Sequence, residues 1–415
     1  MQYIVADDLT GASDAGVQSA KRGARTIVWL DYERPVTTCD ADVVVVDTDS
    51  RAESAATAYD RMTKLVRRLA PGSPRDIVKK MDSTLRGNFG AETRAALEAQ
   101  PGAFALVCPA YPKNGRTVRD GVLFVHGTPV NETDFGRDLF SPVRDARVRA
   151  HLPVPVAMFD LATIRGGVGA LNRAIDAARS SGIRAAVADA ETDEDLRALA
   201  AIDATRRDLF WTGSAGIMEH LEHDRPAASS DRLPIAGAVV FLIGSLSAMT
   251  QLQIEGFARH AAVEELDPTD VLRGATTVAD AVARVRGAVA RGNDVLLAMD
   301  GERAAVLAAL AFGAERGWDV RMTSERLRKA LLSAIAPIVT ERQGATFVLS
   351  GGDIARSFCD AFGIRGMTLL AETAPGIPLS RAIGADMFLV TKAGGFGHPD
   401  SYREILSKLK AKVTA

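Results

Sequence analysis

Two adjacent aspartates near the amino terminus are the first residues whose types could do chemistry. Asp7 and Asp8 follow the apolar residues 3–6, which predict a β-strand, and residues 11–13 then permit a helix. In an open α/β sheet, ligands bind beyond the carboxyl ends of the strands, where neighbouring carboxylates hold Mg²⁺ or accept hydrogen bonds from substrate hydroxyls. Capping of the helix is the alternative role, and it accounts for one acid but hardly for two.

A second dense group of polar side chains follows the predicted strand at 77–80. A ligand that carries both a carboxylate and hydroxyl groups needs cations together with hydrogen-bond donors and acceptors. The loop contains these types: Lys80, Asp82, Ser83, Arg86 and Asn88. Arg51, after a third predicted strand at 43–46, could add a bidentate clamp. Helix caps and solvated charges would explain one isolated loop better, but three strand ends together favour a binding site.

A polar, glycine-containing segment at 109–117 precedes the apolar residues 121–125. Its composition is that of a hairpin laid over a site. Tyr111, Asn114 and Arg116 could reach a ligand from this segment, or they could face water in a turn-rich flap. The sequence leaves both interpretations open.

Three turns rich in glycine and serine recur at predicted strand ends in the second half of the chain. They occupy residues 244–247, 350–354 and 392–397. Glycine lets the backbone approach phosphate oxygens, and the positive end of a helix dipole favours their negative charge. The three turns together predict a nucleotide-binding site. None has the spacing of a Walker A loop or of the dinucleotide fingerprint, so neither a P-loop NTPase nor a standard dinucleotide fold is supported.

The order of the expected elements indicates the fold class. Short apolar runs alternate with amphipathic segments rich in alanine and arginine, which predicts an α/β protein with mainly parallel sheets. A polar, proline-flanked stretch at 223–234 lacks periodicity and is typical of an interdomain connection. We therefore expect two α/β lobes, a substrate-binding domain at 1–225 and a nucleotide-binding domain at 235–415, with the active site in a cleft between them.

The composition is typical of a globular protein that acts on small molecules. The 415 residues are 47% hydrophobic, and 50 basic against 52 acidic residues leave a formal charge of -2. The electrostatic footprint of a nucleic-acid binder is therefore missing. No apolar run approaches the roughly 20 residues of a membrane span and no basic, apolar leader opens the sequence, so we expect a cytoplasmic protein. Cys39, Cys108 and Cys359 form neither a zinc pattern nor a disulfide framework, and buried thiols are expected.

Five segments together resemble the four-carbon acid sugar kinase family, and the match spans nearly the whole chain: 7–12, 80–88, 108–112, 350–353 and 392–397. The resemblance implies an amino-terminal lobe that binds a sugar acid such as threonate, erythronate or an oxo-tetronate, and a carboxyl-terminal lobe that binds ATP. Members phosphorylate the hydroxyl on carbon 4. The sequence Lys-Met-Asp-Ser-Thr at 80–84 is more similar to the threonate and erythronate kinases, which leaves 3-oxo-tetronate as the alternative substrate.

Carried over by position, the resemblance implies that five residues bind the acid substrate: Asp8, Arg51, Lys80, Asp82 and Ser83. The motifs add Asp7 and Arg86 to this set. In the same way the resemblance implies that six residues bind the nucleotide: Ser245, Gly351, Gly352, Asp353, Ile354 and Gly397. The motifs add Ser247, Lys392 and Gly395. Mg²⁺ is expected with ATP, and the sequence assigns no ligands to it.

Phosphoryl transfer needs an acceptor hydroxyl held in line, neutralised phosphate charge and usually a carboxylate that takes the proton. Asp8 and Asp353 are the two candidates for this catalytic role. Asp8 is slightly favoured for binding the hydroxyl, and the base is left open between the two. A nicotinamide-dependent oxidoreductase and a non-catalytic sugar-acid binding protein are the rival classes. The sequence does not fix the oligomeric state, and a homodimer is one possibility.

Overall fold

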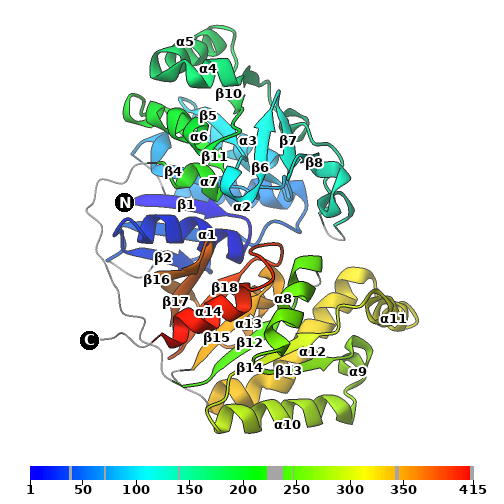
Figure 1. The fold of residues 1–415 in the computed structure, drawn as a ribbon. Coiled ribbons are helices and arrows are strands. Elements are labelled where there is room, and N and C mark those ends of the chain that lie inside the picture. The colour runs from blue at the N-terminus through cyan, green and yellow to red at the C-terminus, as the bar shows by residue number, and fades with distance from the viewer. Residues whose placement is uncertain are drawn as a thin grey trace. The chain divides into compact units, whose positions relative to one another are not determined.

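The structure is a computed structural model that divides into two compact units, Met1–Ala228 and Ser229–Ala415, called here the N-terminal and C-terminal units (Figure 1). It describes residues 1–36, 40–69, 72–138, 141–221, 237–245, 247–341 and 345–411. The predicted α/β fold is confirmed. The predicted connection at 223–234 lies outside the described residues, as does Cys39.

A parallel sheet forms the centre of the N-terminal unit. In order across the sheet its strands are β2 (Thr26–Trp29), β3 (Val43–Asp47), β1 (Gln2–Ala6), β4 (Ile77–Lys80), β11 (Leu209–Gly213), β5 (Phe104–Cys108), β10 (Ala185–Ala188) and β9 (Ala157–Phe159). β3 reads Val-Val-Val-Val-Asp and is buried throughout, as expected for a parallel strand covered on both faces. Because all of these strands are parallel, the loops that follow them meet at one edge of the sheet.

Helices alternate with these strands, as the sequence predicts. They are α1 (Leu9–Ala20), α2 (Ala55–Leu69), α3 (Phe89–Ala99), α4 (Leu161–Arg165), α5 (Gly167–Ser180), α6 (Asp193–Ala200) and α7 (Ala215–Met218). The segment after β5 forms a small antiparallel sheet of its own from β6 (Arg116–Arg119), β7 (Val122–Val125) and β8 (Thr128–Pro129). The predicted hairpin is therefore present in the structure.

The C-terminal unit has a mixed sheet. Its strands, in order across the sheet, are β13 (Ala262–Leu266), β14 (Val295–Met299), β12 (Val239–Ile243), β15 (Thr346–Ser350), β18 (Phe388–Lys392), β17 (Ile377–Ile383) and β16 (Gly366–Ala374). The first five are parallel, whereas β17 runs antiparallel to both of its neighbours. The helices are α8 (Ala248–Ala258), α9 (Pro268–Arg273), α10 (Thr276–Ala290), α11 (Arg303–Ala314), α12 (Val320–Glu341), α13 (Gly352–Ala361) and α14 (Ser401–Lys410).

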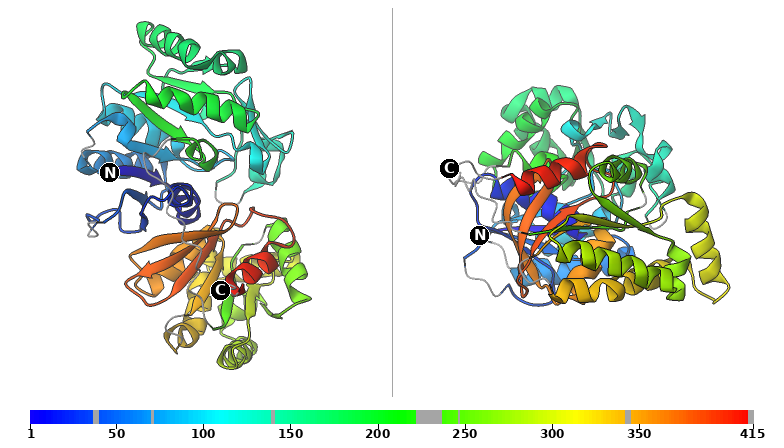
Figure 2. Two further views of the ribbon diagram at one scale, coloured as in Figure 1. Left: turned by 60° about the vertical axis from the view of Figure 1, so that its left-hand side comes forward. Right: turned by 60° about the horizontal axis from the view of Figure 1, so that its bottom comes forward.

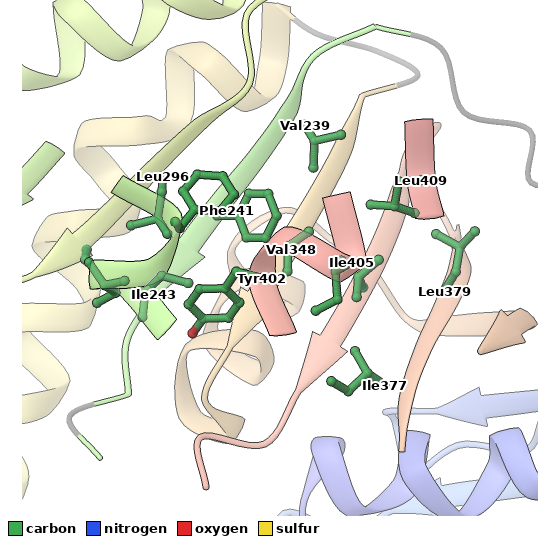
Figure 3. Close-up of a cluster of buried hydrophobic side chains, with 14 residues drawn as sticks. Val239, Phe241, Ile243, Leu296, Val348, Ile377, Leu379, Tyr402, Ile405 and Leu409 are labelled. Atoms are coloured by element: carbon green, nitrogen blue, oxygen red, sulfur yellow. The ribbon is translucent and has the colours of Figure 1, made fainter. Parts of the chain in front are cut away.

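Alternate side chains of these strands serve the two faces of the sheet. On β15, Phe347 contacts Phe358 of α13 at a ring separation of 5.2 Å, whereas Val348 belongs to the cluster on the opposite face. That cluster includes Phe241, whose ring lies 4.6 Å from that of Phe257 and 5.6 Å from that of Tyr402 (Figure 3). The sheet is thus a layer between two sets of helices, as the turned views of the ribbon show (Figure 2). This core fixes the strand ends from which the glycine-rich turns begin.

Two further predictions concern burial and membranes. Cys108 and Cys359 are buried, as expected, and burial raises the pKa of Cys108 to about 12. Among the helices that the structure describes, none combines the length and the apolar character needed to cross a bilayer.

Candidate active site

The acidic pair after β1 lies beside Arg51, as the strand order requires. β1 pairs with β3 and β4, and Ala6 is in register with Asp47, so the loops after these strands meet at one edge. Nε and Nη2 of Arg51 each donate to one carboxylate oxygen of Asp7 at 3.0 Å. Burial alone would raise the pKa of Asp7, but Arg51 and Lys79 outweigh it, and the pKa lies below its usual value.

Asp8 both caps a helix and joins the charged cluster. Its Oδ1 accepts from the backbone N–H of Gly11 at 3.0 Å and lies 2.7 Å from Nη2 of Arg51, while Oδ2 accepts from Thr10 Oγ1 at 2.7 Å. The two roles that the sequence left as alternatives therefore coincide in one carboxylate. The first turn of α1 is fixed by the same oxygen that faces Arg51.

Lys80 reaches the same place from the end of β4. Its side chain is almost fully buried, and Nζ donates to the carbonyl of Met81 at 3.0 Å. A methyl group on Gly11 would lie 2.5 Å from Asp8 Oδ1 and 3.2 Å from Lys80 Nζ. Gly11 thus leaves room where an acid and a cation converge. In the part of the chain that the structure describes, Lys80 makes no ion pair.

Asp82 and Arg86 pair with each other within their loop. Arg86 donates from Nε to Asp82 Oδ2 at 3.0 Å and from Nη2 to Oδ1 at 3.2 Å, and its Nη1 lies 3.4 Å from Asp138. Burial would raise the pKa of Asp82, but Arg86 and Arg51 hold it well below the usual value. Ser83 is buried in the same loop. Asn88 instead donates to backbone carbonyls of residues 50 and 53, which is a structural role.

The structure therefore brings the seven predicted substrate residues to one edge of the sheet. The roles of the two arginines differ from those expected. Arg51 and Arg86 were expected to offer cations to a ligand. Both guanidinium groups are already engaged by carboxylates of the protein. For Arg51 the sequence could not show this, because Asp7 lies 44 residues away along the chain.

The three glycine-rich turns of the C-terminal unit also lie together. Ile243, Ser350 and Lys392 are in register on β12, β15 and β18, so the turns after them leave the sheet side by side. A methyl group on Gly394 would lie 2.1 Å from Ser245 Oγ. Gly351 has a φ of 115°, which favours glycine, and a methyl group there would lie 3.3 Å from the backbone nitrogen of Ser245.

Serine and threonine hydroxyls hold these turns against one another. Ser247 caps α8 and donates from its hydroxyl to the carbonyl of Gly394 at 2.9 Å, and Thr250 Oγ1 donates to Ser245 Oγ at 2.8 Å. Gly395 and Gly397 are exposed, and Gly397 has a φ of 84°. Gly352 begins α13, and Ile354 is buried beneath the turn against Gly244.

Lys392 is a buried cation at the base of these turns. Its Nζ donates to the carbonyls of Ala393 at 3.0 Å and Gly394 at 3.2 Å, and it lies 5.4 Å from the centre of the Tyr402 ring. Burial lowers the pKa of Lys392 to about 7. No carboxylate of the described residues pairs with Lys392. A buried unpaired ammonium is costly, and phosphate oxygens would relieve that cost.

Asp353 stands in the first turn of α13, and its side chain is 67% exposed. Its Oδ2 lies 3.4 Å from Nη1 of Arg328, which comes from α12. Sequence reasoning missed Arg328, because it lies mid-helix and follows neither a strand nor a glycine. Nε of Arg328 is buried without a hydrogen-bond partner.

Among the described residues, one group of three side chains has the spacing of metal ligands: Asp193, Glu219 and His220. Lys113 already contacts both carboxylates of this group. It contains none of the residues selected from the sequence.

Two family models match the chain, one in each unit. Residues 2–221 match the family described as sugar-binding N-terminal domain, and residues 240–402 match the nucleotide-binding C-terminal domain. The chain is 34% identical to D-threonate kinase of Cupriavidus necator, covering 95% of this chain and 94% of that protein. It is 33% identical to 3-oxo-tetronate kinase of Methylobacterium radiotolerans, covering 98% of each. The chain belongs to the four-carbon acid sugar kinase family.

This four-carbon acid sugar kinase shares its fold with solved structures. A Salmonella typhimurium protein described as a putative tRNA synthase matches with a TM-score of 0.79 at 24% identity, covering 97% of this chain and 98% of that one. At that identity the likeness shows the fold alone. An oxidoreductase is not favoured, since the relatives are kinases.

Proposed function

We propose that this kinase transfers the terminal phosphoryl group of ATP to the C4 hydroxyl of D-threonate or D-erythronate. The observation that carries the proposal is the buried set of carboxylates and cations at the strand ends of the N-terminal unit, which includes a lysine that forms no ion pair with any described residue. Such a set suits a small ligand that bears both an acid and hydroxyl groups.

The choice of acid rests on the loop at 80–84. The two kinds of relative, acting on D-threonate and on 3-oxo-tetronate, are 34% and 33% identical to this chain, so overall identity does not separate them. The Lys-Met-Asp-Ser-Thr sequence favours threonate or erythronate. 3-Oxo-tetronate remains the second candidate, because a relative of nearly equal identity acts on it.

In the C-terminal unit the three turns supply the chemistry for ATP. Backbone N–H groups at the start of α13 and the hydroxyl of Ser245 are donors for phosphate oxygens, and Lys392 adds a charge beneath them. Ser247, whose hydroxyl donates to Gly394, holds the turn in place. The turns hold one carboxylate, Asp353, so their donor set fits a nucleotide that brings Mg²⁺ on its own phosphates rather than an all-protein metal cage. The ion would neutralise phosphate charge there.

The engagement of the two candidate catalytic acids suggests different roles. Both oxygens of Asp8 are already bonded within the protein, by Gly11 and Arg51 on one side and by Thr10 on the other. Among the residues that the structure describes, Asp353 has one polar side-chain contact, at 3.4 Å, and its side chain is exposed. We therefore assign proton removal from the C4 hydroxyl to Asp353. Asp8 is assigned a positioning role, in which it orients the substrate together with Arg51 and Lys80. The cleft between the lobes stays a prediction.

A coupled assay of ATP consumption tests the proposal. The purified chain is offered D-threonate, L-threonate, D-erythronate and 3-oxo-tetronate, and the phosphorylated carbon is located by phosphorus NMR. Turnover highest with D-threonate or D-erythronate supports the proposal, and turnover highest with 3-oxo-tetronate selects the second candidate. Without turnover on any of these acids, the assignment is wrong. A rise in melting temperature with Mg-ATP checks the nucleotide site independently.

A further inference from the structure

Arg116 is a buried cation that the proposed mechanism does not use. It begins β6, and its residue is only 7% exposed. One guanidinium nitrogen donates to the carbonyl of Asn114, while Nε is buried without any hydrogen-bond partner. Within the described ranges, no carboxylate forms an ion pair with it. Because an unpaired charge is expensive to bury, this arrangement favours an anionic ligand for Arg116.

The backbone fixes where Arg116 stands. Tyr111 and Arg116 exchange two backbone hydrogen bonds, of 2.8 and 3.1 Å, and Tyr111 follows the end of β5 by three residues. β5 is separated from β4 by the single strand β11, so the loop after β4 begins at the same edge of the sheet. Burial lowers the pKa of Arg116 and Asp82 opposes that shift, which also places the guanidinium within electrostatic reach of the 80–86 loop.

Two cations at this edge of the sheet form no ion pair with a carboxylate of the described residues. Arg51 is matched by the aspartates after β1, and Arg86 is matched by Asp82 and Asp138. Lys80 and Arg116 remain, each bonded only to a backbone carbonyl in the described structure. Nδ2 of Asn114 is also buried without a partner, two residues from Arg116. The hairpin therefore offers unused donors from two neighbouring side chains.

We propose that Arg116 binds the carboxylate of the four-carbon acid, with Asn114 as an additional donor, and thereby selects acids over neutral polyols. This inference rests on the proposed function, because it names the group that recognises one end of that substrate. A guanidinium presents paired donors that match the two oxygens of a carboxylate, whereas an ammonium is a point charge. Lys80, which lies beside Asp8 and Gly11, is then left for the hydroxyl groups.

Arg116→Gln and Arg116→Lys test the proposal, with Arg119→Gln as the matched control. Arg119 lies on the same strand, but its side chain is 57% exposed and pairs with Glu191 at 3.4 Å. Each variant is assayed with D-threonate and with D-threitol, in which a CH₂OH group replaces the carboxylate. We expect Arg116→Gln to raise KM for D-threonate by about 30-fold or more, because a buried charge loses its partner. KM for D-threitol and for ATP should stay within about twofold, a change worth only ~0.4 kcal/mol.

The other variants sharpen the result. Arg116→Lys keeps the charge but not the paired donors, so its preference for the acid over the polyol should fall between wild type and Arg116→Gln. Lys80→Met should weaken D-threonate and D-threitol alike, because both carry the hydroxyls. If Arg116→Gln weakens both ligands equally, or behaves like Arg119→Gln, the proposal is overturned. If circular dichroism shows that Arg116→Gln does not fold, Arg116→Lys tests the proposal through the ratio of KM for D-threitol to KM for D-threonate.

Direct binding separates this inference from the proposed function. Calorimetric titration of D-threonate and D-threitol into the protein needs no turnover. If the wild type binds the acid more tightly and Arg116→Gln loses that preference, the inference stands even without kinase activity on this acid. If the wild type phosphorylates D-threonate but Arg116→Gln keeps the full preference, the inference fails while the proposed function survives. A wild type that does not distinguish the two ligands also overturns it.

Discussion

The ammonium group of Lys79 lies 2.8 Å from a carboxylate oxygen of Glu92, and both side chains are closed off from solvent, at 0% and 1% exposure. Ser50 donates to the other oxygen of Glu92 at 2.7 Å. Lys79 also lowers the pKa of Asp7, after Arg51 the second largest of the effects that oppose burial. The ammonium of this pair thus helps to keep Asp7 ionised.

Removal of one partner of this pair should be strongly destabilising. Lys79→Met leaves Glu92 buried without a counter-charge, and we expect a loss of about 3–5 kcal/mol in the free energy of unfolding of the N-terminal unit. The double variant Lys79→Met/Glu92→Leu should recover much of that loss. Urea unfolding measures both. Arg94→Ala, which breaks the exposed pair with Glu98 on the same helix, should cost at most about 1 kcal/mol, and equal costs would contradict the assignment.

The two candidate catalytic acids should respond differently to neutralisation. Asp353→Asn should lower kcat by about 10²- to 10⁴-fold with KM for the acid nearly unchanged, because it removes the proton acceptor. Asp8→Asn should chiefly raise KM, since it disturbs Arg51 and the start of α1. Steady-state kinetics measure both. Asp360→Asn, at an exposed position on α13, is the control, and a kcat loss confined to Asp8→Asn would exchange the two roles.

Close packing of the glycine turns predicts a specific loss of nucleotide binding. In Gly394→Ala the new methyl group would lie 2.1 Å from Ser245 Oγ, so the turns must separate. We expect the Kd for ATP to rise about 10- to 100-fold, corresponding to a strain of 1–3 kcal/mol. Gly287→Ala on α10, where a methyl group has 3.4 Å to its nearest neighbour, should leave the Kd unchanged. Calorimetric titration with ATP compares the two variants, and similar Kd values would exclude the packing argument.

Lys392 should take up a proton when ATP binds above neutral pH. Burial lowers its pKa to about 7, so at pH 8 the ammonium of the free protein is mostly deprotonated. Phosphate charge raises that pKa again, which predicts uptake of up to about one proton per nucleotide. Binding heats in Tris and HEPES, whose ionisation enthalpies differ, measure the uptake. Lys392→Met should abolish the buffer dependence, and an unchanged dependence would show that another group titrates.

The same shift makes stability depend on pH in a defined direction. From pH 7 toward the ordinary lysine value of 10.5, the unfolded chain holds a proton that the folded protein does not. The contribution of Lys392 to the free energy of unfolding therefore increases with pH across this window. Urea unfolding at pH 7 and pH 9 should show a smaller difference in Lys392→Met than in the wild type.

The sequence was most informative where a buried strand ends in polar residues. β3 and β15 are apolar runs, and the candidate residues Arg51 and Asp353 follow them closely, so both the strands and the loops could be predicted. β13 was missed because its two glutamates break the apolar pattern, and β9 because it has only three residues. The ion pairs could not be predicted either, because the acid that contacts Arg51 depends on the order of the strands in the sheet.

The hairpin that carries Arg116 forms a small sheet of its own. Its strands pair with one another and, at Val118, with Ala190 just beyond β10, but not with the strands whose ends carry Asp8 and Lys80. Residues of the hairpin can therefore change without reordering those strands. If this segment recognises the acid end of the ligand, a new preference could evolve by altering an interchangeable part. The catalytic scaffold would be inherited intact.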